Sequence, residues 1–481
     1  MSRTVEVHEA SIADLQRALA EGRATSLQLV ESYLERIEAF DVAGPELNAI
    51  AVTNHEARAE ARALDGERRE HGPRGPLHGI PLLVKDNYDI AGMPTTAGSR
   101  ALEGLVAQKD AAIVAQLRQA GAIVLAKTNL HELAAGMTTV GSAHGRTRNP
   151  YDPGRNPGGS SGGTSAGIAA SFAAVGLGSD TVGSIRIAAA QTALFGLRPT
   201  QGLTSVEGIV PLCLSQDTAG PLARTVHDLA LVLDVITHSL DPSSHFVGRL
   251  DPRALAGRRI GRLETLFGNQ PEDREVAESG RAALERFAKL GAEVIPVELP
   301  ELPALLDSTY ILILGEFPDD LAAYLGRNPT SPVADLEELA ATGRVHPEVA
   351  PLVAGALAAP WKQSDQYRQA IANRKRLREL VLAQLESACL DGLAYPPIRR
   401  VAAPLGEEQL GSNAHVSANS GLPAISIPIG FTDSGLPVGL ELLGPQRSDE
   451  QLVAMAYAWE RTQDPRRPPP TTPPVGAGAS Q

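Results

Sequence analysis

Two glycine-rich segments that contain serine, together with one lysine, hold the residue types in this chain that could do chemistry. The segments read GGSSGG at 158–163 and DTVGSIR at 180–186, and they contain Ser160 and Ser184. A glycine-rich loop turns sharply, binds an anion with its N–H groups, or flexes. In the second segment the consecutive N–H groups around Val182, Gly183 and Ser184 would suit a developing negative charge. The residue types and the spacing of these two segments therefore allow acyl chemistry on a serine.

Lys85 ends the apolar segment Ile80–Val84 and is the residue that could activate a serine. A serine hydroxyl is a poor nucleophile until a positioned base takes its proton. A buried lysine can be that base, because desolvation lowers the pKa of its amine. The alternative is an edge lysine that keeps its charged end in water. The residues around Lys85 leave both interpretations open.

Histidine is the more usual base, but none of the 11 histidines stands in a recognisable Ser–His–Asp arrangement. His131 and His144 flank the first serine segment, and we interpret both as surface or loop residues. The letters GGSSG at 158–162 match the G-x-S-x-G pattern, but a loop rich in proline and glycine precedes them. A nucleophile elbow needs an apolar strand before the serine, so we discount this match.

The motifs GGSSGG, DTVGSIR and PLLVKD, in their order along the chain, resemble the amidase signature family of serine hydrolases. The resemblance extends to QDTAGPLARTVHDLAL at 216–231 and SGLPAISIPIGFTDSGLPVGLELLGP at 420–445. It implies that Ser184 is the nucleophile that forms an acyl-enzyme. It also implies that Ser160 follows a cis peptide bond and bridges Ser184 to the base Lys85. The predicted site residues are these three, the oxyanion-hole residues Thr181, Val182, Gly183 and Ser184, and the substrate-binding residues Gly136, Met137, Thr138 and Ser160.

Two residues depart from the family pattern. Val182 stands where the family commonly has glycine, and a β-branched residue tolerates positive φ badly. We therefore expect an ordinary backbone conformation at Val182, or local strain. Ala188 stands where the family usually has proline, and we expect a looser turn after Ser184.

Charged residues near the second serine segment have structural interpretations. We expect Asp180 to brace the loop that contains Ser184. Arg186 either binds a substrate carboxylate or forms a buried ion pair with an acid such as Asp217, and the ion pair is favoured. Cys213 is interpreted as a small core residue.

Strand and helix patterns alternate over the first half of the chain, which is typical of an α/β layered fold. Ser11 and Thr25 are expected to cap two N-terminal helices, and a run of small residues, Ala166–Leu177, suits a tightly packed buried helix. Ala424–Ile429 and Pro437–Leu443 form a predicted hairpin around an Asp-Ser-Gly turn. From 259 to about 400 the pattern is rich in helices. The predicted fold is a single α/β domain with a large mixed central sheet surrounded by helices.

Composition excludes several classes of partner. The chain has 481 residues and a net charge of −13, so nucleic acid and anionic membranes are not expected to bind it. Two cysteines form no disulfide framework, the N-terminus lacks the apolar core of a signal peptide, and no apolar run is long enough for a membrane span. We expect a cytoplasmic monomer or homodimer that needs no metal and no organic cofactor.

The predicted domain covers residues 1–463, with a helical specificity region at 300–400, and the proline-rich segment 464–481 is predicted to be disordered. The predicted function is hydrolysis of amide C–N bonds in a small molecule, with esters and carbamates (urethanes) as further substrates. One alternative is the glutaminase-type subunit of a tRNA-dependent amidotransferase. A more remote one is a non-catalytic binder of phosphate or nucleotide, although no G-K-[ST] motif supports it.

Overall fold

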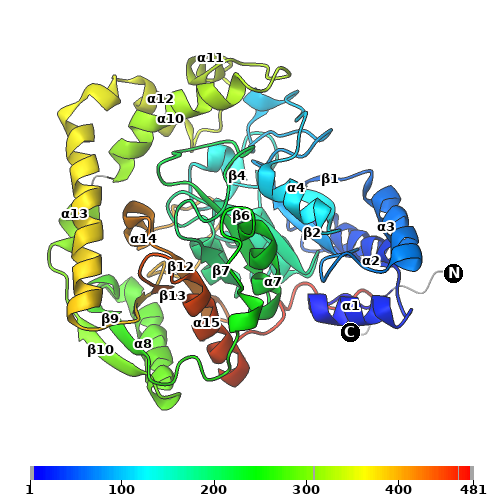
Figure 1. Ribbon diagram of the computed structural model, residues 1–481. Helices are drawn as coiled ribbons and strands as arrows, with labels where there is room; N and C mark the ends of the chain where they lie inside the picture. Colours follow the sequence, from blue (N-terminus) through cyan, green and yellow to red (C-terminus); the bar gives the residue numbers. More distant parts are fainter. Residues whose placement is uncertain (1–4, 307–308, 464, 477–481) are drawn as a thin grey trace.

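A computed structural model describes residues 5–306, 309–463 and 465–476. An eleven-stranded mixed sheet runs through the molecule, and helices surround it (Figure 1). From one edge to the other the strands are β1 (Ile50–Thr53), β3 (Ile123–Thr128), β2 (Pro81–Lys85), β6 (Val175–Asp180), β8 (Thr218–Ala223), β7 (Phe195–Arg198), β12 (Ala424–Phe431), β13 (Pro437–Leu443), β11 (Gly392–Tyr395), β9 (Arg259–Leu263) and β10 (Glu293–Val297). This architecture confirms the predicted fold class.

The sheet contains two groups of three parallel strands. β2 is parallel to both β3 and β6, and β9 is parallel to both β10 and β11. The other neighbouring strands are antiparallel, including the predicted hairpin of β12 and β13. The carboxyl ends of β2 and β6 therefore meet at the same edge of the sheet. A small separate hairpin joins β4 (Val140–Gly141) to β5 (Gly145–Arg146).

The helices outside the segment 300–390 pack around this sheet. They are α1 (Ile12–Ala20), α2 (Ser26–Ile37), α3 (Ala57–His71), α4 (Ala112–Gln119), α5 (Gly162–Ala169), α6 (Arg186–Gln191), α7 (Val226–Thr237), α8 (Arg274–Lys289), α14 (His415–Ser420) and α15 (Asp449–Gln463). Ser11 and Thr25 cap α1 and α2 through complete capping boxes, as predicted. None of the described helices is both long and apolar enough to cross a membrane.

The run of small residues divides between two elements instead of forming one helix. α5 ends at Ala169, and β6 begins at Val175. All eight residues of α5 are buried. A Cβ at Gly176 would lie only 2.5 Å from Thr164 Cγ2. Small side chains therefore allow the helix and the strand to pack closely, and that packing fixes the position of the loop before α5.

Five helices, α9 (Leu302–Leu306), α10 (Thr309–Leu325), α11 (Leu336–Ala341), α12 (Ala350–Leu357) and α13 (Asp365–Ser387), lie in the 300–400 region. α10–α13 form the upper and left flank of the molecule in Figure 1. We call α10–α12 the cap. Buried residues of the cap, among them Leu312 and Phe317, share a hydrophobic cluster with Leu133 and Leu212 of the loops beneath it. The cap is therefore anchored next to the serine loops by apolar packing.

The proline-rich segment contradicts one prediction. Residues 465–476 are not disordered but pack against the N-terminal half of the chain, while residues 464 and 477–481 lie outside the described residues. Tyr151 Oη donates to Arg467 O at 2.7 Å, and the buried Arg36 guanidinium donates to Thr472 O and Pro473 O, each at 3.0 Å. Composition alone misleads here, because the contacts that hold this segment are specific ones: carbonyl acceptors, the ion pair of Arg466 with Glu9, and the buried Pro465 and Pro469.

Candidate active site

The three predicted catalytic residues lie together at the carboxyl edge of β2 and β6. Lys85 is the last residue of β2, and Asp180 is the last residue of the parallel strand β6. Ser160 lies two residues before α5, and Ser184 lies two residues before α6. Parallel pairing places the ends of β2 and β6 side by side, and each serine loop leads into a buried helix.

Lys85 Nζ lies 2.8 Å from Ser160 Oγ and 2.9 Å from Ser179 Oγ. Asn87 Nδ2 donates to the same Ser179 hydroxyl at 3.0 Å. Lys85, Ser160 and Asn87 are fully or almost fully buried. The peptide bond between Gly159 and Ser160 is cis, as the resemblance implies. Sequence reasoning missed Ser179 and Asn87, although both directly flank predicted elements.

The Lys85 amine loses its positive charge easily in this position. Burial lowers the pKa of Lys85 to about 7, and the carboxylates of Asp180 and Asp217 oppose that shift only in part. At pH 7 about half of the molecules would therefore hold a neutral amine that can accept a proton. The snorkelling interpretation of Lys85 is wrong, because the side chain has no exposed surface.

Ser184 lies where a substrate could reach it. Its exposed fraction is 6%, and it lines an open cleft of about 190 Å³. Ser161 N–H donates to Ser184 O at 3.2 Å, which ties the two serine loops together. Among the described residues no hydrogen bond joins the Ser160 and Ser184 hydroxyls, so the last contact of a relay would have to form when substrate binds.

The predicted oxyanion-hole donors are not equivalent. Gly183 N–H already donates to Asp180 Oδ1 at 2.7 Å. The N–H groups of Thr181, Val182 and Ser184 have no acceptor within the described part of the chain. In this conformation a carboxylate thus occupies the Gly183 N–H, and a role for Gly183 in the oxyanion hole stays a prediction. The other three donors remain open to a developing oxyanion.

Asp180 braces the loop that contains Ser184, as expected. Its two oxygens also accept from Ile185 N–H and from the Arg186 and Arg198 guanidinium groups. All of these side chains are buried. The pKa of Asp180 lies well below its ordinary value, because the two arginines outweigh the cost of burial.

Arg186 forms a buried ion pair, but not with Asp217 as the sequence suggested. It donates to Glu441 at 2.7 and 2.9 Å and to Asp180 at 3.1 Å. Tyr395 Oη donates to Glu441 Oε1 at 2.7 Å. Glu441 lies on β13, far from Arg186 in the sequence, so no local pattern could indicate it. With both carboxylates engaged, Arg186 is a structural residue and not a free substrate anchor.

Asp217 instead holds the first residue of the second serine loop. Thr181 Oγ1 donates to Asp217 Oδ1 at 2.5 Å, and the N–H groups of Leu212 and Cys213 donate to Oδ2. Burial raises the pKa of Asp217 to about 6. Cys213 is buried, and burial raises the pKa of its thiol well above the ordinary value, so the thiol stays protonated.

The two departures from the family pattern have simple structural outcomes. Val182 has no positive φ, because the neighbouring Gly183 takes that conformation with φ 104°. The half-buried Val182 side chain lines the cleft. Ala188 is buried inside α6, so a helix and not a loosened turn follows Ser184.

The cleft around Ser184 is mostly apolar. Two of the predicted substrate-binding residues, Gly136 and Met137, line it, whereas Thr138 lines a neighbouring chamber. The remaining lining residues are Ala134, Ala135, Thr181, Val182, Leu212, Tyr310, Ile313, Leu352, Ser412 and His415. No arginine, lysine, aspartate or glutamate is among the described lining residues. Sequence reasoning missed the cap residues, because periodicity marks a helix as buried without saying what it covers.

Two histidines near the serine loops are neutral at pH 7. Burial lowers the pKa of His415, which lines the cleft, to about 4. Burial likewise lowers the pKa of His131 to about 4. His131 lies in a loop, as predicted, but is buried, and His144 approaches the buried Asp86. His131 N–H donates to Ser160 O at 3.1 Å, but in the described structure neither imidazole ring forms a hydrogen bond to a catalytic serine.

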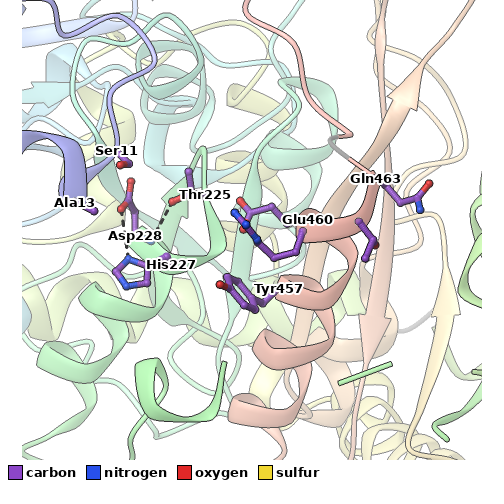
Figure 2. Close-up of a pocket in the computed structure, with 10 residues that line it drawn as sticks. Ser11, Ala13, Thr225, His227, Asp228, Tyr457, Glu460 and Gln463 are labelled. Carbon is purple, nitrogen blue, oxygen red and sulfur yellow. Dashed lines mark hydrogen bonds and ion pairs between the residues drawn. The ribbon is translucent and has the colours of Figure 1, made fainter. Parts of the chain in front are cut away.

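A larger cavity of about 670 Å³ lies between α1, α7 and α15 (Figure 2), and no residue of the serine loops lines it. Two backbone donors there are already occupied by the chain's own carboxylates. Asp228 accepts from Ile12 N–H and Glu460 accepts from Val226 N–H, at 3.1 and 3.0 Å. The cleft at Ser184 is smaller, but it is the one that contains a candidate nucleophile.

Comparison with known proteins gives matches along nearly the whole chain. A sequence model of the family described as Amidase matches residues 28–453. The A subunit of glutamyl-tRNA(Gln) amidotransferase from Synechococcus sp. (strain RCC307) is 38% identical over 473 residues, which cover 93% of this chain and 96% of that protein. The corresponding protein of Thermus thermophilus is 37% identical over 468 residues, with coverage of 93% and 96%.

Solved structures with the same architecture include enzymes of more than one kind. Native peptide amidase from Stenotrophomonas maltophilia superimposes with a TM-score of 0.89 at 39% identity, covering 96% of this chain and 98% of that one. The A subunit of glutamyl-tRNA(Gln) amidotransferase from Thermotoga maritima gives a TM-score of 0.75 at 26% identity, with coverage of 95% and 96%.

Proposed function

The chain belongs to the amidase family, and we propose that it hydrolyses an amide C–N bond through an acyl-enzyme on Ser184. The observation that carries the proposal is the buried Lys85 amine 2.8 Å from Ser160 Oγ, in the loop tied to Ser184. A lysine whose pKa is about 7 can act as a base near neutral pH. No solvent-exposed lysine could do so, because its ordinary pKa is about 10.4.

The reaction then follows from the positions of these groups. Neutral Lys85 takes a proton from Ser160, and Ser160 takes the proton of Ser184 as Ser184 Oγ attacks the substrate carbonyl. The free N–H groups of Thr181, Val182 and Ser184 receive the oxyanion. The proton returns through Ser160 to the leaving amine, and water then hydrolyses the ester on Ser184 by the same route. Esters and carbamates would be attacked in the same way.

The cleft lining supports a stand-alone amidase that accepts an apolar group. A free glutamine presents an α-ammonium and an α-carboxylate, and such charges are stable in a cleft only when paired. The described cleft residues offer neither an acid nor a strong base. The peptide amidase of S. maltophilia, with its TM-score of 0.89, points in the same direction.

The names of the relatives support the alternative function, that of an amidotransferase subunit, more directly. Proteins named as the A subunit of glutamyl-tRNA(Gln) amidotransferase match at 34–38% identity over nearly the whole chain. On that basis the chain would be a subunit that releases ammonia from glutamine and works with a partner protein. The apolar cleft would then need charged groups from a conformational change or from the partner.

One assay separates the two candidates. We would measure kcat/KM for one aryl acyl group presented as anilide, primary amide, ester and carbamate, and for free glutamine. Ser184→Ala should lose at least about 1,000-fold on every substrate. The control Ser165→Ala, which removes a hydroxyl that donates to Gly162 O, should retain activity. Turnover of aryl compounds without a partner identifies a stand-alone amidase, whereas turnover of glutamine alone identifies the amidotransferase subunit.

A further inference from the structure

A second chamber of about 400 Å³ lies beside the serine cleft. Ala135, Gly136 and Met137 line both cavities, so the two share a wall. The chamber differs from the apolar cleft in chemistry. Its other lining residues are His131, Thr138, Glu348, Gly406, Glu407, Glu408 and Gln409. A substrate held at Ser184 therefore has a polar, acidic space directly next to it.

The negative charge of the chamber is only partly neutralised. Glu348 forms an ion pair with Arg146 and accepts from Thr138 Oγ1 at 3.4 Å. Glu407 and Glu408 are exposed, and neither forms an ion pair with any described residue. Two carboxylates are thus left without a counter-charge at the mouth of the chamber. The described residues contain no group suited to hold a metal ion, which favours an organic cation.

His131 gives the second, independent indication of a ligand. It is 4% exposed, and its ring lines the chamber. Nδ1 accepts from Thr138 N–H at 3.3 Å, so the neutral ring carries its proton on Nε2. Nε2 has no hydrogen-bond partner among the described residues. Nε2 is not among the buried side-chain atoms that lack a partner, so it is open to the chamber, where it can donate to an acceptor of a bound substrate.

We propose that this chamber is a substrate subsite for an ammonium or guanidinium group linked to the scissile amide through a hydrogen-bond acceptor. Glu407 and Glu408 attract the cation, and His131 Nε2–H donates to the acceptor in the linkage. The proposal rests on the proposed amide hydrolysis at Ser184. It makes substrates with a positively charged remote end preferred over neutral or anionic ones.

The test uses matched amides that share one scissile group and differ at the remote end. The ends are a primary ammonium, a hydroxyl and a carboxylate, each on spacers of increasing length, with and without an amide carbonyl in the spacer. For one spacer length, kcat/KM should be at least about tenfold higher for the ammonium than for the hydroxyl compound. The carbonyl-containing spacer should be preferred, which tests His131 without disturbing the ring packed against Gly136.

The chamber variant is Glu407→Gln with Glu408→Gln, both at exposed positions that do not threaten the fold. Its matched control is Glu278→Gln with Glu285→Gln on α8, which changes net charge equally. The preference for ammonium should fall to about twofold or less in the chamber variant and persist in the control. Equal loss in both proteins would indicate only the overall field of the molecule and would overturn the subsite.

Binding to the Ser184→Ala protein, measured by calorimetry, separates this proposal from the proposed function. A tenfold tighter Kd for the ammonium compound, lost in the chamber variant, supports the subsite even if no compound is hydrolysed. Equal Kd values across the ammonium, hydroxyl and carboxylate series at every spacer length overturn it. If turnover fails while this binding preference holds, the function assignment is wrong and the subsite stands.

Discussion

The ionisation of Lys85 sets the expected pH dependence of the reaction. The neutral amine is the active form, so the rate rises with pH through the pKa of about 7 and then becomes constant. At pH 6 about one tenth of the molecules would be active. Measuring kcat/KM from pH 3 to 9.5, with the chemical step shown to limit the rate, checks this. An inflection near pH 4 would instead indicate His131 or His415, whose pKa values are about 4.

Asp217 should act as a positioning residue for the oxyanion loop. Its negative charge opposes the lowered pKa of Lys85, and its oxygen holds Thr181. Asp217→Asn should therefore move the inflection of the pH profile to lower pH and reduce kcat by up to about 100-fold. Thr181→Val is the matched control, because it removes the hydrogen bond but keeps the charge. It should reduce kcat without moving the inflection. The same profile in both variants would contradict the electrostatic role.

At the scale of elements, the buried cluster of Asp180, Arg186, Arg198 and Glu441 joins β6, α6, β7 and β13. Asp180→Asn leaves two buried guanidinium groups with one carboxylate, and breaking such a pair costs about 3–5 kcal/mol. Urea unfolding at pH 7 should show that loss. The exposed pair of Arg23 and Glu21 is the control, and Glu21→Gln should cost no more than about 1 kcal/mol.

The pH dependence of this loss has a definite sign. The pKa of Asp180 is lowered in the folded protein, so its contribution to stability is present above the pKa of about 3.9 in the unfolded chain. That contribution disappears as the pH falls toward the folded pKa. The unfolding free energies of wild type and Asp180→Asn should therefore approach one another in acid. A constant difference from pH 7 to pH 3 would show that charge is not the cause.

Elements whose signals lie in neighbouring residues could be predicted from the sequence. The helix caps at Ser11 and Thr25 and the turn between β12 and β13 are short-range signals, and all three predictions are confirmed. β9 escapes prediction, since the segment RIGRL alternates charge with small or apolar residues inside a helix-rich region. Tyr310–Leu314 could be strand or helix by pattern, and it lies in α10 because the cap buries one of its faces.

The site residues show the same difference between local motifs, which could be predicted, and contacts between distant segments, which could not. Lys85, Ser160 and Ser184 could be found because their motifs are local. The partner of Arg186 is on β13, and the cleft wall at Tyr310, Ile313 and Leu352 comes from the cap. Such contacts depend on how distant segments pack, which periodicity and composition do not encode.

At the scale of the whole molecule, the cap and the core meet through buried polar contacts as well as apolar packing. Tyr324 Oη on α10 donates to Asp89 Oδ1 at 2.7 Å, and Ser215 Oγ donates to Glu316 Oε1 at 2.8 Å. Asp89 follows β2 by four residues, so this contact links the cap to the strand that ends in Lys85. The cap is thus tied by a buried hydrogen bond to the segment that follows Lys85.

The C-terminal segment 465–476 lies near α1 and α2, on the side of the molecule away from the cap (Figure 1). There it supplies two carbonyl acceptors to the buried Arg36. Ending the chain at Gln463 would leave that guanidinium with the carbonyls of Ala170 and Ser171 only. Loss of buried acceptors from a charged group costs at least about 2 kcal/mol, so the truncated protein should unfold at lower urea concentration. Its kcat/KM should not change, because the segment contacts none of the catalytic residues. A chain that ends at Gly476 is the control and should match the full-length protein, and equal stability of all three would mean that these carbonyls do not stabilise the fold.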